Sequence, residues 1–262
     1  MPTPKVVYED NDIIVINKPS GLITHQKNID DKQPSVVDWV IENYPELKDV
    51  GEPFIASGTP VPRYGILHRL DKDTSGLLLI AKNNETFFAM KKQFQNHIIQ
   101  KSYQALVYGK PKEPSGIIDA PLGRIGMKRT TQMTGKKLID GKESITEYKT
   151  LKNFEKYTLL DVTPKTGRTH QIRVHLKSVG CPVAGDIVYA PEGWSRLASS
   201  NSLTSQSRIR DSQSESGQKM PPGLNRLFLH AYKLEFITPD GKAITLEADL
   251  PEDLQNILNK IQ

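Results

Sequence analysis

The sequence contains a single cysteine, Cys181, among its 262 residues, so it cannot form an internal disulfide. This excludes a disulfide-stabilised secreted domain and makes a reducing cytoplasm the expected location. No apolar run approaches the length of a membrane span, and the first residues lack the apolar core of a signal peptide. With 37% hydrophobic and 25% charged residues, the composition is that of a soluble globular protein with enough apolar side chains for a sizeable core.

Several familiar catalytic motifs are also missing. There is no Gly-rich phosphate loop followed by Lys-Ser/Thr, and the protein-kinase catalytic loop is echoed without its partner motifs. His170 and His175 lie five residues apart, which does not match the helical His spacing of zinc hydrolases, and no metal site is predicted. Cys181 precedes Pro182 and has no evident base partner, which argues against a catalytic thiol.

The net charge of +5 and the isoelectric point near 9.1 suit a polyanionic partner. Lysines and arginines are concentrated at positions 91–92, 128–129, 136–137 and 165–173, whereas acidic residues gather towards both ends of the sequence. The excess of positive charge is mild, and many basic proteins bind no nucleic acid, so the charge alone leaves the kind of partner open.

Residues 68–77 (HRLDKDTSGL) form the most informative stretch. Two acidic and two basic residues crowd a Ser-Gly turn that leads into the apolar run at positions 77–81. Catalytic groups are often carried on such loops, and a nearby arginine can lower the pKa of a carboxylate and orient it. The stretch thus indicates carboxylate chemistry by Asp71, with Asp73 as a second candidate. A structural Arg–Asp pair that pins a turn is the alternative, and the residues alone leave both open.

The remaining pattern predicts an α+β fold with a central, mostly antiparallel β-sheet flanked by short helices. We expect roughly ten strands, and they include segments 6–9, 13–16, 98–109, 157–164, 185–189, 227–236 and 244–248. Helices are expected at 35–44, 84–97, 171–179 and 251–261. No composition break divides residues 1–262, so a single catalytic domain is expected, with residues 194–222 as a polar, flexible insertion.

Two further positions, Lys18 and Tyr103, have two interpretations each. Lys18 ends an apolar strand and is either a salt-bridge partner near a cleft or, more commonly, a solvated strand end. Tyr103 shares a strand face with Ala105 and Val107, as a core residue or as a phenol lining a pocket. The aromatic stripe of helix 84–97, which includes Phe87 and Phe88, is expected in the core and not as a base-stacking platform.

Arg168, Thr169 and His170 lie at the start of the predicted helix 171–179. Backbone N–H groups and the helix dipole favour an anionic ligand there, which predicts a phosphate contact.

In several of these blocks the sequence resembles the RluA-type pseudouridine synthases. The resemblance is carried by VVYEDNDIIVINKPSGL, HRLDKDTSGLLLIAK, KSYQALVYG, TGRTHQIRVHL and GDIVY, in the family's order, from about Val6 to Tyr189, with LFLHAYKLEF matching the closing strands. It implies the pseudouridine synthase fold, with an active-site cleft across the sheet. It also implies isomerisation of specific uridines in ribosomal or transfer RNA: the glycosidic bond breaks, the uracil rotates, and it rejoins through a carbon.

The resemblance assigns roles by position. Asp71 is the catalytic carboxylate, whether it attacks the ribose or the base or acts as a base on the sugar. Tyr103 packs on the target base and assists proton transfer, and Arg173 pairs with Asp71. The remaining positions, which contact substrate RNA, are Arg69, which fills the gap left by the flipped nucleotide, with His68, Thr74, Arg168, Thr169 and His170. No metal or organic cofactor is implied, and a cytoplasmic monomer is expected.

Two departures from the family are present. The sequence begins at the catalytic blocks, so an N-terminal S4 RNA-binding domain is not expected, and RNA recognition would rest on the catalytic domain and the polar insertion. The family's Gly-Asp-x-x-Tyr-Gly block ends in Ala190 here. The alternative function is a non-catalytic RNA-binding or RNA-chaperone protein on the same fold, in which Asp71 would be dispensable.

Overall fold

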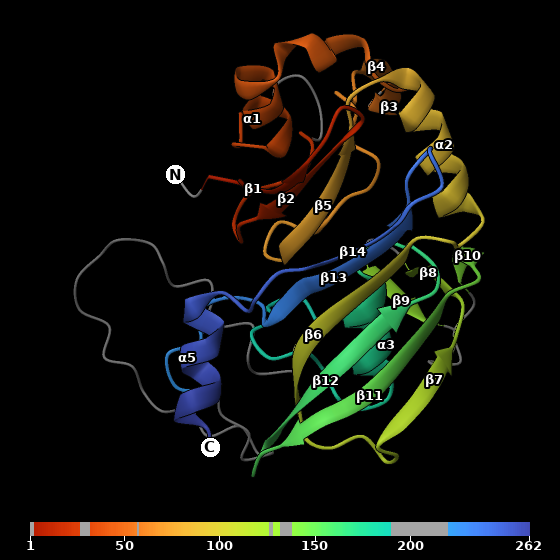
Figure 1. Cartoon of the computed structure of the whole chain (residues 1–262). Helices are drawn as coiled ribbons and strands as arrows, with labels where there is room; N and C mark the ends of the chain where they lie inside the picture. Colours follow the sequence, from red (N-terminus) through yellow and green to blue (C-terminus); the bar gives the residue numbers. More distant parts are fainter. Residues whose placement is uncertain (1–2, 27–31, 57, 126–127, 132–137, 190–219) are drawn as a thin grey trace. The chain divides into compact units, whose positions relative to one another are not determined.

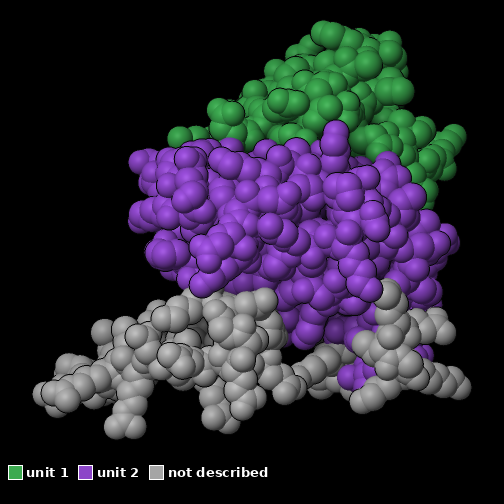
Figure 2. Space-filling view, turned by 90° about the horizontal axis from the view of Figure 1, so that it is seen from below, with its two compact units in different colours: residues 1–103, 229–249 green, residues 104–228, 250–262 purple. Residues whose placement is uncertain are grey.

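The computed structural model describes residues 3–26, 32–56, 58–125, 128–131, 138–189 and 220–262. Contacts between Cα atoms group the chain into two compact units, which Figure 2 colours separately. Unit 1 comprises residues 1–103 and 229–249, and unit 2 comprises residues 104–228 and 250–262. Within the described ranges, no helix is long and apolar enough to cross a membrane.

The sheet of unit 1 has the strand order β1-β2-β5-β13, with β14 paired to β13. Its strands are β1 (Lys5–Glu9), β2 (Ile13–Lys18), β5 (Ser75–Ala81), β13 (Leu229–Ile237) and β14 (Ala243–Glu247), and a separate short hairpin joins β3 (Phe54–Ala56) to β4 (Thr59–Val61). The pairs β1–β2, β2–β5 and β13–β14 are antiparallel, whereas β5 and β13 are parallel. Strands distant in sequence therefore meet at the start of β5.

The core of unit 1 is built on two apolar runs, which form β2 and β5. All seven residues of β5 are buried, and Ile13 to Ile16 of β2 are completely inaccessible to solvent. Strands covered on both faces read as continuous apolar runs instead of alternating ones. Each fully buried aliphatic side chain contributes about 1.5–3 kcal/mol relative to an exposed one. The strand that begins at Ser75 is thus a rigid support for the loop that precedes it.

Helices flank this sheet (Figure 1): α1 (Val36–Asn43), the short 3₁₀ helix η1 (Pro45–Asp49) and α2 (Asn84–Gln95), which packs on β5. The start of α1 is a capping box in which the Ser35 hydroxyl accepts from Asp38 N and the Asp38 carboxylate accepts from Ser35 N. The prediction that the aromatic residues of α2 lie in the core was partly wrong. Phe87 is buried, but Phe88 is 47% exposed, because it lies one residue further round the helix.

Unit 2 begins within β6 (Gln100–Tyr108), at Gln104, and its sheet continues from β6 through β12 and β11 to β7. The other strands of unit 2 are β7 (Ser115–Asp119), β11 (Ile145–Asn153) and β12 (Tyr157–Pro164), with a small sheet of β10 (Ile139–Lys142), β8 (Leu122–Ile125) and β9 (Lys128–Thr131). Helix α3 (Gln171–Ser178) packs against β9, β11 and β12, and α5 (Glu252–Lys260) contributes Leu254, Ile257 and Leu258 to a core cluster (Figure 1).

The α+β class with a mostly antiparallel sheet is confirmed, and so are the expected helices. The described residues contain fourteen strands against the roughly ten expected, because short strands also form in loop segments. The strand expected at 185–189 was wrong: this segment consists of turns. Most of the insertion expected at 194–222 lies outside the described residues.

Candidate active site

The loop that leads into β5 is held against the strand itself. Gly65 N donates to Val50 O (2.9 Å), Ala81 N donates to Gly65 O (2.9 Å), and Leu67 N donates to Leu79 O (3.3 Å). A Cβ atom at Gly65 would lie 2.0 Å from Ala81 O, so this close approach requires glycine. The loop before Asp71 is therefore positioned by backbone contacts.

Lys18 anchors the other end of the same loop. Its ammonium donates to the carbonyl oxygens of Pro19 (2.8 Å), Leu22 (2.8 Å) and Lys72 (3.1 Å), and its side chain is completely buried. Three acceptors match the three donors of an ammonium group. The preferred interpretation of Lys18 as a solvated strand end was wrong, because the charge is compensated by carbonyl dipoles inside unit 1.

Two hydroxyl groups complete the anchoring. Ser20 Oγ donates to Asp73 O (2.9 Å), and Thr24 Oγ1 donates to Leu70 O (2.9 Å) while it accepts from Leu70 N (3.2 Å). The backbone on both sides of Asp71 is thus tied to the segment after β2. Ser20 belongs to the NKPSGL block of the sequence, and Thr24 follows this block.

The loop enters β5 through a buried serine and a glycine. Ser75 Oγ lies 2.9 Å from His230 Nδ1, and His230 Nε2 lies 3.1 Å from Ala248 O. A carbonyl can only accept, so the Nε2 of a neutral His230 carries the proton and Nδ1 accepts from the Ser75 hydroxyl. Both side chains are buried, at 1% and 0% exposure, so this pair joins β5 to β13 and is not a nucleophile–base pair open to substrate.

Asp71 and Tyr103 are electrostatically coupled within unit 1. Tyr103 is 8% exposed, and Asp71 is partly exposed. Burial raises the pKa of the Tyr103 phenol, and the negative charge of Asp71 raises it further. The phenol therefore stays protonated at neutral pH and is available as a hydrogen-bond and proton donor beside a carboxylate that solvent reaches.

His68 and Thr74 form hydrogen bonds that hold the loop, whereas Arg69 in the same loop is exposed. His68 Nε2 accepts from Leu79 N (3.0 Å), and burial followed by the Lys101 charge lowers the His68 pKa to about 3. Thr74 is buried, and its N donates to Asp71 O (3.2 Å). The expected RNA contacts of His68 and Thr74 stay predictions, and both groups shape the loop directly.

Arg69 is exposed and belongs to a cationic cluster. Burial, together with the charges of Arg63 and Arg69, lowers the pKa of His25 to about 3. The pKa of Arg63 is lowered by burial and by Arg69, against the opposing effect of Glu52. Like charges at close range repel one another, and an anionic ligand would relieve this repulsion.

In unit 2, Arg173 is held by Asp186 and Tyr189. Arg173 Nε and Nη2 lie 2.7 and 2.8 Å from the two Asp186 carboxylate oxygens, with the aspartate side chain completely buried. The guanidinium carbon is 5.1 Å from the Tyr189 ring centroid, a cation–π contact. Asp186 Oδ1 also accepts from Val188 N (2.9 Å) and Tyr189 N (3.0 Å), so one carboxylate fixes both the turn and the arginine.

The side chains of Gln171 and His175 fix the position of α3, and thereby that of Arg173, through hydrogen bonds to neighbouring segments. Gln171 Nε2 donates to Ile145 O (2.9 Å), and its Oε1 accepts from Thr166 Oγ1 (2.7 Å). His175 is completely buried; its Nε2 lies 2.9 Å from Ala120 O, and its Nδ1 lies 2.8 Å from Thr146 Oγ1. Burial lowers the His175 pKa, which is consistent with a neutral ring.

The predicted phosphate-binding residues lie just before α3. His170 has left-handed backbone angles (φ 60°, ψ 18°), and its Nδ1 lies 2.8 Å from the Tyr189 hydroxyl. The exposed Arg168 donates from Nε to Glu143 O (3.1 Å), and Thr169 is partly buried. A phosphate contact by these three residues stays a prediction.

The site residues therefore form two sets, each organised within its own unit. His68, Arg69, Asp71, Thr74 and Tyr103 belong to unit 1. The residues of unit 2 are Arg168, Thr169, His170 and Arg173. Pairing of Arg173 with Asp71 stays a prediction. Sequence reasoning missed the roles of Asp186 and Tyr189, although both lie in the quoted GDIVY block.

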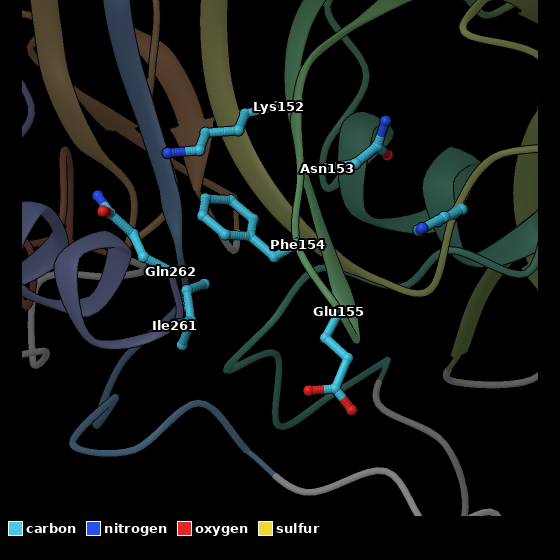
Figure 3. A pocket seen from close by; sticks show the side chains of 7 residues that line it. Lys152, Asn153, Phe154, Glu155, Ile261 and Gln262 are labelled. Atoms are coloured by element: carbon cyan, nitrogen blue, oxygen red, sulfur yellow. The ribbon is translucent and has the colours of Figure 1, made fainter.

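Other features of the described residues do not coincide with this site. No group of His, Cys, Asp or Glu in the described ranges could hold a metal ion. A cavity of about 500 Å³ in unit 2 is lined mainly by Lys152, Asn153, Phe154, Glu155, Ile261 and Gln262 (Figure 3). None of the predicted site residues lines this cavity.

Residues 12–178 match a family described as RNA pseudouridylate synthase. The chain belongs to this family. The match contains Asp71, Tyr103 and Arg173, and the resemblance to RluA-type pseudouridine synthases is thereby confirmed.

Curated relatives extend the match over almost the whole chain. A protein of Nitrosomonas europaea named ribosomal large subunit pseudouridine synthase D is 37% identical over 98% of this chain and 65% of its own length. An uncharacterised RNA pseudouridine synthase of Bacillus subtilis is 33% identical over 98% of this chain and 72% of its own length. The chain thus spans about two thirds of the length of these pseudouridine synthases.

A solved structure supports the fold of the family. The human RNA pseudouridylate synthase domain containing 4 aligns over 98% of this chain and 92% of its own, with a TM-score of 0.68 and 23% identity. The pseudouridine synthase fold expected from the sequence is confirmed.

Proposed function

We propose that this chain isomerises specific uridines of RNA to pseudouridine, with Asp71 as the catalytic carboxylate. The observation that carries the proposal is the electrostatic coupling between a partly exposed Asp71 and a buried, protonated Tyr103. Asp71 lies on a loop whose backbone is anchored on both sides of it. Membership of the pseudouridylate synthase family supports it.

The reaction cleaves the bond between C1′ of the ribose and N1 of uracil and forms a bond between C1′ and C5. The C5 proton is lost, and N1 gains a proton, so the reaction is redox-neutral and needs no external electron donor. Asp71 acts on the nucleoside, and the Tyr103 phenol packs on the base and assists proton transfer. Arg173, oriented by Asp186, stabilises the carboxylate charge.

An enzyme that acts on a base must take it out of the stack, at a cost of a few kcal/mol. We propose that the target uridine is flipped towards Asp71 and that Arg69 fills the gap that it leaves. His68, Thr74, Arg168, Thr169 and His170 complete the RNA contacts. The chain acts as a cytoplasmic monomer with residues 1–262 as one catalytic domain, and large-subunit ribosomal RNA is the first substrate to test.

The test is pseudouridine mapping of total RNA, by chemical tagging and sequencing, from cells with and without the gene. The sites that vanish should return with wild type and with Asp73→Asn, a matched change two residues away, but not with Asp71→Asn. Purified Asp71→Asn should still bind RNA. Unchanged pseudouridine at every position would instead support a non-catalytic RNA-binding or RNA-chaperone protein.

A further inference from the structure

Lys101 lies on the same face of β6 as Tyr103. Residues two positions apart in a strand point to the same side and are about 7 Å apart along it. Burial raises the pKa of Tyr103, and Asp71 adds to this effect, so this face of β6 adjoins the carboxylate of the proposed site. A cation on this face is therefore placed beside the reacting groups.

The surroundings of Lys101 compensate its charge poorly. Its Nζ lies 5.3 Å from the Phe94 ring centroid, and the Phe94 ring lies 5.1 Å from the His68 ring. Among the described residues, no carboxylate forms an ion pair with Lys101, unlike Lys82, whose Nζ lies 2.9 Å from Glu9 Oε1. Burial lowers the Lys101 pKa to about 8. A desolvated ammonium without an anion is unfavourable in the unliganded protein.

We propose that Lys101 binds a backbone phosphate of the substrate RNA next to the target uridine. This proposal rests on the proposed function, because it takes RNA as the substrate. A phosphate carries a full negative charge, so it can neutralise the Lys101 ammonium. The dipole of a uracil carbonyl carries no net charge and cannot do so. Lys101 is partly exposed as a residue, so part of it is open to a ligand from solvent.

The groups that face Lys101 do not titrate near pH 8, so a change in RNA affinity in this pH range reports on the Lys101 ammonium. His68, from the loop, has a pKa of about 3, and the pKa of Tyr103, on the same strand, lies well above its ordinary value. Phe94, from α2, does not titrate. Lys101 loses its proton as the pH rises through about 8, and a bound phosphate raises its pKa. RNA affinity should therefore fall between pH 8 and 10 in wild type.

The experiment measures binding of in vitro transcribed large-subunit ribosomal RNA in the Asp71→Asn background, where turnover does not interfere. Lys101→Met should reduce the slope of log Kobs against log salt by about 0.7–0.9, the equivalent of one phosphate contact. Lys101→Arg should keep the slope and lose the alkaline decline, because arginine stays charged. Lys242→Met, an exposed lysine of the same unit, is the matched control and should bind as the background does.

Two further measurements separate a ligand from a structural role. Lys101→Met should unfold at the same temperature as the background or a higher one, because the uncompensated ammonium is removed. The ¹⁵N resonance of the Lys101 ammonium should titrate at higher pH with uridine 5′-monophosphate than with uridine. Wild-type salt slope and pH profile in Lys101→Met would overturn the inference, and so would an equal titration of Lys101 with the nucleotide and with the nucleoside. Absence of isomerisation with the Lys101 results intact would overturn the proposed function alone.

Discussion

The Arg173 guanidinium and the Asp186 carboxylate form a two-point ion pair in unit 2, at 2.7 and 2.8 Å. The same carboxylate accepts from the backbone of Val188 and Tyr189, so the pair links α3 to the following turn. An arginine held in this way has a fixed orientation, which a side chain free in solvent does not have.

Replacing Asp186 with Asn should destabilise the protein by about 3–5 kcal/mol, because the buried Arg173 guanidinium would lose its two-point ion pair with this carboxylate. Denaturant unfolding measures the effect. Asp253→Asn is the matched control: Arg226 Nε and Nη2 also bind this carboxylate, but Asp253 is 51% exposed. Its loss should cost less than about 1 kcal/mol. Equal costs for the two variants would show that burial does not distinguish the pairs.

Lys18→Met should loosen the loop that carries Asp71. The carbonyl oxygens of Pro19, Leu22 and Lys72 would lose a donor, and each unsatisfied buried acceptor costs about 1–3 kcal/mol. We expect lower stability in urea and slower pseudouridine formation, while Lys5→Met, on the exposed strand β1, changes neither. A Lys18→Met protein with wild-type stability would refute the anchoring role.

Gly76→Ala should prevent stable folding. A Cβ atom at this position would lie 2.2 Å from Ala231 O on the parallel neighbour β13, and the backbone angle φ is +119°. Gly21→Ala is a control for backbone conformation alone, because its φ is +85° and no atom lies within 4 Å of the new Cβ. It should cost about 1–2 kcal/mol. Circular dichroism and thermal melting distinguish the two variants, and similar melting would contradict the steric argument.

Stability should fall as the pH decreases from 7 to 5.5. Burial holds the pKa values of His25 and His68 at about 3 in the folded chain, whereas an unfolded histidine titrates near 6.5. The unfolded state therefore binds more protons in this window, and stability is present above pH 6.5 and is lost below it. Each histidine should contribute about 1 kcal/mol to the difference.

Urea unfolding of His68→Gln and His25→Gln at the two pH values checks this expectation. Each variant should show a smaller pH effect than wild type, by about the contribution of one histidine. A pH dependence that neither substitution reduces would assign the effect to other groups.

Much of the fold was predictable because its signals are local. The apolar runs at β2 and β5 and the Ser35 capping signal act through neighbouring residues, so the corresponding strands and helix were predicted. The segment at 185–189 was mispredicted because Ile187 and Val188 favour a strand, while the buried Asp186 carboxylate binds the backbone into a turn.

The sequence by itself determined the family of this protein and the residue types of the proposed site: a carboxylate, a phenol and a guanidinium in blocks that resemble those of pseudouridine synthases. The tertiary structure decided how these groups are held. Lys18 reads as a strand end, and only folding surrounds its ammonium with the carbonyl groups of Pro19, Leu22 and Lys72. Desolvation and long-range pairing depend on residues far apart in the chain, so they arise only when the core forms.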